Sequence, residues 1–172
     1  MMKNPAVKYG VIALVFTIIW TLMEHVVGFN TTNHEAGQYA RMVGAFVFYV
    51  LIFVAIHARR KQQGGLLSFG QGFATGATVS IIYSLGCCAW YALYGELINT
   101  RYKPTLMAFE RAKLEAANLS ADIIDAKMKQ VDLSTGGSVL SYVLLIVFMF
   151  LIGCVVSAIA ALILQRKKAV TA

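Results

Sequence analysis

Four long apolar stretches limit what this sequence can fold into. They cover residues 9–28, 42–57, 73–98 and 139–164, and each approaches or exceeds the roughly 20 residues that a helix needs to cross a bilayer. Because backbone polar groups in lipid must be hydrogen-bonded within their own segment, such stretches are expected to be helices. Hydrophobic residues make up 59% of the chain, more than in an average soluble domain. We therefore predict an all-α membrane protein, a single integral domain over residues 1–172 with four transmembrane helices.

Basic and acidic residues lie on different sides of these stretches. Basic clusters occur at Lys3 and Lys8, at residues 59–61 and at residues 166–168, whereas all 8 acidic residues fall on the opposite side. Basic residues beside spanning helices favour the cytoplasmic side, and acidic residues contribute little to orientation. Since an even number of spans returns both ends to one side, we expect both termini in the cytoplasm.

The net charge of +7 is divided among small clusters at helix ends. A nucleic-acid-binding protein would instead gather its basic residues on one face. Clusters at helix ends contact anionic lipid head groups, at about 1 kcal/mol per basic residue. The predicted partner is thus the lipid bilayer, and we do not expect the chain to bind nucleic acid. The first apolar stretch lacks the short-residue cleavage site of an export signal, so we expect an uncleaved helix.

Small residues recur every fourth position on the third and fourth stretches. The two rows are Gly72, Gly76, Ser80, Ser84 and Cys88, and Gly153, Ser157 and Ala161. Lipid gives no hydrophobic reward for helix association, so close backbone approach along such rows supplies the attraction. We predict packing seams. They join either two spans of one chain, which we favour, or two copies across a dimer.

The connection after the second stretch contains a glycine pair followed by apolar residues. Gly64 and Gly65 are expected to end the second helix. Leu66, Leu67 and Phe69 would then form an apolar patch in the membrane interface, before Ser68 or Gln71 opens the third helix.

An external loop over residues 99–138 is predicted to hold an amphipathic helical pair. Pro104 suits the first turn of one helix, and Ser120 suits the N-cap of the next. Leu114, Ile124 and Met128 recur at helical spacing. Their apolar sides would rest on the membrane interface or cap the bundle, or would form a docking face for a partner.

Candidate chemistry is confined to a few polar residues near the external ends of the spans. Glu24, His25, His34, Glu35 and Glu96 include residue types that bind zinc, but Glu24 and His25 are neighbours and point to different sides of a helix. We assign no catalytic, cofactor-binding or metal-binding residues and predict no cofactor.

Glu24 is an ionisable group close to a predicted span, which makes it a functional candidate. Arg41 lies at the matching depth of the second span and is a plausible ion-pair partner. We favour the simpler interpretation, in which Glu24 reaches water at the membrane surface. Cys87, Cys88 and Cys154 lack metal-site spacing, so we interpret them as packing residues.

Several segments together resemble a known family. The string Gly-Gly-Leu-Leu-Ser-Phe-Gly-Gln at residues 64–71, the opening segment at residues 3–10 and the external helical loop are similar to the bacterial membrane proteins catalogued as domain of unknown function 4199. The resemblance implies a small four-helix protein of the bacterial inner membrane, and it implies no activity. The external loop is less acidic here than in the family pattern.

From these features we expect a non-enzymatic assembly or accessory subunit that binds a protein partner or forms a homo-oligomer. A small transporter or ion-coupled carrier is the first alternative, although it would need more buried charges than this sequence offers. An intramembrane enzyme or a metal site near Glu24 and His25 is the second.

Overall fold

A computed structural model describes residues 4–166, and this part of the chain consists of helices, the turns and loops that connect them, and one isolated β-bridge. The elements in chain order are α1 (Pro5–Val27), α2 (His34–Gln62), α3 (Phe69–Leu93), the π-helix η1 (Tyr94–Ile98), α4 (Tyr102–Ala116), α5 (Ala121–Ser134) and α6 (Val139–Leu164).

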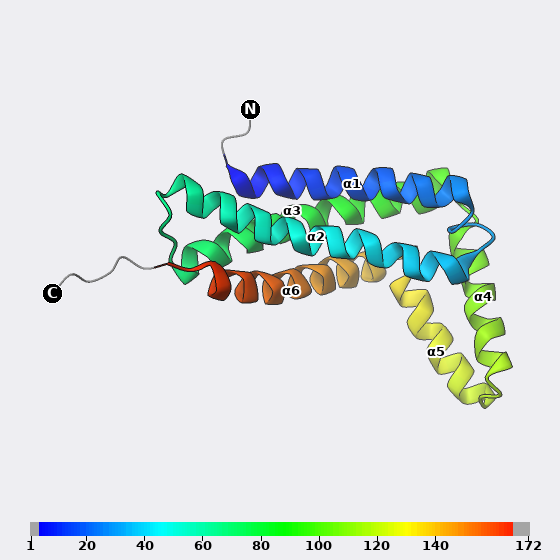
Figure 1. The fold of residues 1–172 in the computed structure, drawn as a ribbon. Coiled ribbons are helices and arrows are strands. Elements are labelled where there is room, and N and C mark those ends of the chain that lie inside the picture. Colours follow the sequence, from blue (N-terminus) through cyan, green and yellow to red (C-terminus); the bar gives the residue numbers. More distant parts are fainter. Residues whose placement is uncertain (1–3, 167–172) are drawn as a thin grey trace.

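The four long helices α1, α2, α3 and α6 lie side by side in one bundle (Figure 1). Helix α3 packs against α1 and α6, and α2 contacts all three of these helices. All four are long and apolar enough to cross a membrane, with η1 extending the third span. The predicted all-α architecture with four spans is therefore confirmed, and the first three helices begin earlier than their apolar stretches.

Polar caps explain these earlier starts. The side chain of Asn4 accepts a hydrogen bond from the Ala6 amide before α1, and that of Asn33 accepts one from the Ala36 amide before α2. Ser68 opens α3 in a reciprocal capping box with Gln71. The sequence leaves the start of this helix open between Ser68 and Gln71. Because capping residues are polar, they lie outside the apolar runs.

The two rows of small residues face each other along α3 and α6. A Cβ atom added to Gly76 would lie 2.6 Å from Ser157 Cβ, and one added to Gly153 would lie 2.6 Å from Ser80 Cβ. Further along, the same construction on Gly72 meets Ala161 Cβ at 3.0 Å. The seam is therefore intramolecular, and glycine is required because a larger residue would push the two backbones apart.

The α2–α3 loop and the end of α6 lie together at one end of the bundle, which we call the loop end. Gly64 and Gly65 have φ angles of +70° and +89°, which glycine adopts without strain. Leu67 pairs with Arg166 in the β-bridge and is 1% exposed. The predicted interfacial patch is thus wrong for Leu67, which is buried in the core and paired with the chain that follows α6. Lys3, Lys167 and Lys168 lie outside the described residues.

Helices α4 and α5 form a hairpin that projects from the opposite end of the bundle, which we call the hairpin end (Figure 1). Pro104 lies in the first turn of α4, and Ser120 is the N-cap residue of α5. Ile124 and Met128 are buried, at 7% and 6% exposed, because α4 and α5 pack against each other. Of the predicted docking face, Ile124 and Met128 are thus largely covered within the hairpin, Leu114 is half-buried, and the binding of a partner there stays a prediction.

Candidate functional site at the hairpin end

The turn between α1 and α2 carries the residue on which the polar site is built. Gly28 ends α1 with a φ of +93°, and its carbonyl accepts hydrogen bonds from the amides of Thr31, Thr32 and Asn33. This tight turn places Asn30 inside the protein, where it is 2% exposed.

Asn30 connects the two charged residues that sequence analysis paired directly. Its Nδ2 donates to Glu24 Oε2 over 3.1 Å, and its Oδ1 accepts from Arg41 Nη1 over 3.3 Å. Glu24 is 4% exposed, so the prediction that it reaches water is wrong. The other carboxylate oxygen, Oε1, is buried and receives no hydrogen bond from the described residues.

A second set of hydrogen bonds joins this turn to the end of the third span. Asn99 Nδ2 donates to the Asn30 carbonyl over 2.9 Å and to Tyr94 Oη over 3.0 Å. His25 Nδ1 lies 3.0 Å from the same Tyr94 hydroxyl. The π-helical turn η1 makes this possible, because its wider winding brings Tyr94 and Asn99 together, and the Asn99 amide donates to the Tyr94 carbonyl.

His34 ties the hairpin to the bundle. Its Nε2 lies 2.9 Å from Thr105 Oγ1 on α4, and its buried Nδ1 has no partner among the described residues. Tyr102, one turn earlier on α4, contacts the His34 ring, and burial raises the pKa of its hydroxyl. The start of α4 is thus held against the first turn of α2.

The candidate ligand residues from the sequence do not gather at one point. Glu24 bonds to Asn30 and His25 to Tyr94, while Glu35 is exposed on α2. Within residues 4–166, no group of three His, Cys, Asp or Glu side chains is arranged to hold a metal ion. Cys87 is buried in the core, in agreement with a packing role.

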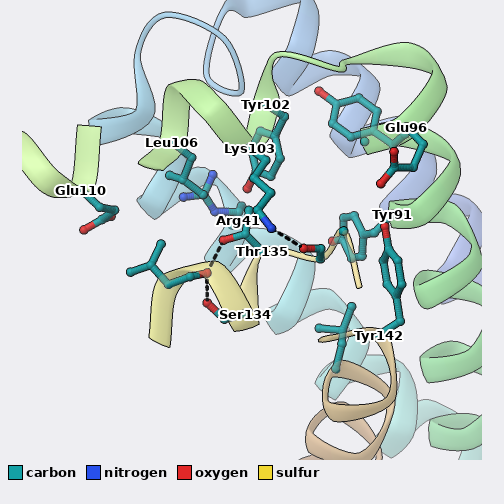
Figure 2. Close-up of a pocket in the computed structure, with 16 residues that line it drawn as sticks. Arg41, Tyr91, Glu96, Tyr102, Lys103, Leu106, Glu110, Ser134, Thr135 and Tyr142 are labelled. Carbon is teal, nitrogen blue, oxygen red and sulfur yellow. Dashed lines mark hydrogen bonds between the residues drawn. The ribbon is translucent and has the colours of Figure 1, made fainter. Parts of the chain in front are cut away.

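A cavity of about 440 Å³, the hairpin cavity, lies where the hairpin meets the bundle. Figure 2 shows Arg41 and Lys103 on one side of it, and Tyr91 and Tyr142 on the other. Lys103 Nζ donates to the Gly136 carbonyl over 2.8 Å and pairs with Asp132 at 2.7 Å. These contacts leave Arg41 as the cation in the lining that has no carboxylate within ion-pairing distance in the described chain.

A second cavity of about 400 Å³, the bundle cavity, lies between α1, α2, α3 and α6. Both cavities are lined by Arg41, Tyr91 and Leu145, so they adjoin. The bundle cavity includes Glu24 in its wall, together with the following aromatic and apolar side chains: Trp20, Phe48, Tyr49, Tyr83, Phe148, Met149 and Ile152. Polar groups at one end and apolar walls at the other are typical of ligand sites.

Sequence reasoning found Glu24 and Arg41 but missed Asn30 and Asn99. Both asparagines lie outside the helices, where neither periodicity nor a motif marks a residue that points inward. Gly28 could have pointed to Asn30, because a glycine at the end of a helix often starts a tight turn.

Comparison with known proteins identifies the family. Residues 8–166 match the family described as a protein of unknown function (DUF4199), and the chain belongs to it. No curated protein and no solved structure matches the chain.

Proposed function

We propose that this chain is a non-enzymatic accessory or assembly subunit of the bacterial inner membrane that holds a partner protein on its hairpin. The observation that carries the proposal is an open groove of about 700 Å³ along α4 and α5. Met107, Met128 and Leu133 form its apolar part. Methionine side chains adapt to varied partner surfaces, and a groove between helices accepts an amphipathic helix.

The rim of this groove carries charges of both signs. Arg111 and Lys129 alternate with Asp125 and Asp132, and Arg111 lies 3.4 Å from Asp125 across the hairpin. An apolar floor within a polar rim is the usual composition of a protein interface. We take the occupant to be a helix of another membrane protein, with charges that complement this rim.

The proposed orientation places the loop end in the cytoplasm and the hairpin outside. Arg59, Arg60 and Lys61 lie in the last turn of α2, and the cytoplasmic preference of basic residues supports this orientation. Basic residues of the hairpin are balanced by acidic partners, as in the pair of Lys103 with Asp132. A segment in which basic and acidic residues balance has little influence on which side of the membrane it occupies.

A small transporter or ion-coupled carrier is the second candidate, favoured by the two adjoining cavities and the buried Glu24. A carrier needs a path to the opposite side of the membrane. The bundle cavity reaches Ile152, and the next residue, Gly153, already packs against Ser80 in the seam. We therefore rank the accessory role first.

Two exposed residues of α5 test the docking groove with the same substitution. Leu133 lines the groove and is 40% exposed, whereas Ile123 lies outside the groove lining and is 46% exposed. Leu133→Asp should abolish co-purification of the partner from native membranes in mild detergent, because it places a charge on the apolar floor. Ile123→Asp should leave co-purification unchanged.

The comparison uses variants whose membrane insertion matches that of the wild type. Co-purification of the same proteins with both variants would overturn the docking role. Recovery of a second copy of this chain alone would replace the proposed partner by a homo-oligomer.

A further inference from the structure

The two cavities at the hairpin end have the combined form of a site for an amphiphile. They adjoin at Arg41, Tyr91 and Leu145, and each volume falls within the several hundred Å³ that are usual for a ligand pocket. Charged groups lie at the junction and toward the hairpin. The part of the bundle cavity furthest from the hairpin is lined by Met149 and Ile152, and by Thr17 and Tyr83, whose hydroxyls are hydrogen-bonded to each other.

Part of the wall of the bundle cavity also lies on the lipid-facing surface of the bundle. Phe148 lines the cavity and is 64% exposed, on α6, which is the most apolar of the four long helices. The cavity is also lined from α2 by Gly44 and Ala45. A hydrocarbon chain can therefore enter between α2 and α6 without leaving the apolar layer.

The charges of the lining discriminate between kinds of head group. Glu24, Glu96 and Glu110 supply carboxylates, while Arg41 is the cation without an ion pair in the described chain. A purely anionic head group would meet these carboxylates, and a purely cationic one would meet Arg41. A head group that carries both charges satisfies both.

The buried carboxylate oxygen of Glu24 favours a ligand that donates a hydrogen bond. Oε1 lacks a donor, while Oε2 is occupied by Asn30. A buried acceptor without a partner is destabilising, and a ligand that donates a hydrogen bond to it removes this penalty. A primary ammonium group donates such bonds, whereas a quaternary ammonium group has no N–H.

We propose that the two cavities together bind one zwitterionic membrane lipid, with its phosphate at Arg41, its primary ammonium group at Glu24 and an acyl chain in the bundle cavity. Asn30 bonds to both charged side chains and so sets the spacing between the two halves of the head group. The lipid enters from the bilayer between α2 and α6.

Native mass spectrometry of the full chain in detergent tests this site with three lipids of identical acyl chains. Phosphatidylethanolamine carries phosphate and a primary ammonium, phosphatidylcholine has no N–H, and phosphatidylglycerol has no cation. The chain should retain phosphatidylethanolamine at least about tenfold more strongly than either of the others, since among the three only its head group carries a cation that donates N–H hydrogen bonds to Glu24. Equal retention of the three would overturn the proposal.

Two variants separate the head-group site from the tail site. Glu24→Gln should remove the preference for phosphatidylethanolamine over phosphatidylcholine, and Glu35→Gln, which alters an exposed carboxylate of α2, should keep it. Gly44→Leu should abolish retention of all three lipids at the site by filling the bundle cavity. A Cβ atom on Gly44 meets only Trp20 Cδ1, at 3.9 Å, so the chain can fold with leucine there.

Thermal unfolding in detergent verifies that Gly44→Leu is folded before its lipid retention is compared. Retention of phosphatidylethanolamine by folded Gly44→Leu would contradict the tail site. Soluble phosphoethanolamine should not displace the lipid at equal concentration, because it lacks the acyl chain. Displacement would show that the site takes a soluble zwitterion, and the lipid proposal would be wrong.

Discussion

Asn30 is the residue that makes a buried charge tolerable in this bundle. Glu24 and Arg41 do not form a direct ion pair, and the amide of Asn30 bonds to both of them while its carbonyl accepts from Asn99. Burial of charged groups is costly unless they are hydrogen-bonded. Asn30 therefore connects α1 and α2 through its side chain, and the end of the third span through its backbone carbonyl.

Replacement of this amide should lower the stability of the fold more than a typical substitution in a loop does. Asn30→Ala removes the donor to Glu24 and the acceptor for Arg41, so we expect a loss of about 1–3 kcal/mol in the free energy of unfolding. Thermal unfolding in detergent measures the change. Gln130→Ala, which shortens an exposed amide on α5, is the control. Equal melting temperatures for the two variants would show that the network does not stabilise the fold.

At the scale of the helices, the strongest constraint is the seam between α3 and α6. These two helices make the most extensive contact in the bundle. Ser80 and Ser157 are fully buried there, and each hydroxyl donates to the carbonyl one turn earlier, at Gly76 and Gly153. Since the hydroxyls are satisfied within their own helices, the attraction between α3 and α6 comes from close packing.

Two glycines of α3 allow the seam to be tested with one substitution. Gly76→Leu places a large side chain against Ser157, whereas Gly70 has no atom within 4 Å of an added Cβ. Gly76→Leu should lower the free energy of unfolding by about 1–3 kcal/mol or more through overpacking. Gly70→Leu should be neutral or slightly stabilising, because leucine has the higher helix propensity.

Melting temperatures of the two variants in the same detergent provide the measurement. A position such as Val79, which lies on α3 but off the row of small residues, is not used as the control because it is fully buried. If Gly70→Leu lowers the melting temperature as much as Gly76→Leu does, the seam is not the contact that holds α3 and α6 together.

Periodic features of this fold are predictable from the sequence, and long-range ones are not. The row containing Gly76 and Gly153 predicts the seam, because small residues at four-residue spacing have one physical use in lipid. Burial of Ile124 is different, because helical spacing shows that a helix has an apolar side but not what covers it. Leu67 was misplaced for a related reason, since its partner Arg166 lies at the other end of the sequence.

The candidate site was only partly predictable for the same reason. Glu24 stands out as a charge within the first apolar stretch, and Arg41 as a charge directly before the second. Their connection depends on a turn and a π-helical segment, which bring together Asn30 and Asn99. Neither asparagine has a periodic neighbour, so composition and spacing give no sign that these residues point inward.

At the scale of the whole molecule, the two ends of the bundle carry different features. The loop end holds the basic last turn of α2, and Arg60 Nη1 donates to the Leu164 carbonyl at the end of α6. The hairpin end holds the polar network, both cavities and the docking groove. Orientation in the membrane therefore decides which compartment the proposed partner occupies and which leaflet supplies the lipid.

Cysteine labelling at the two ends tests this orientation most directly. Ser120→Cys lies at the tip of the hairpin and Leu66→Cys lies in the α2–α3 loop, and both positions are exposed. The native Cys87, Cys88 and Cys154 lie within the spans, so the wild type provides the background. In intact spheroplasts, a membrane-impermeant maleimide should label Ser120→Cys and leave Leu66→Cys unlabelled until the membrane is opened. Labelling of Leu66→Cys with protection of Ser120→Cys would contradict the account.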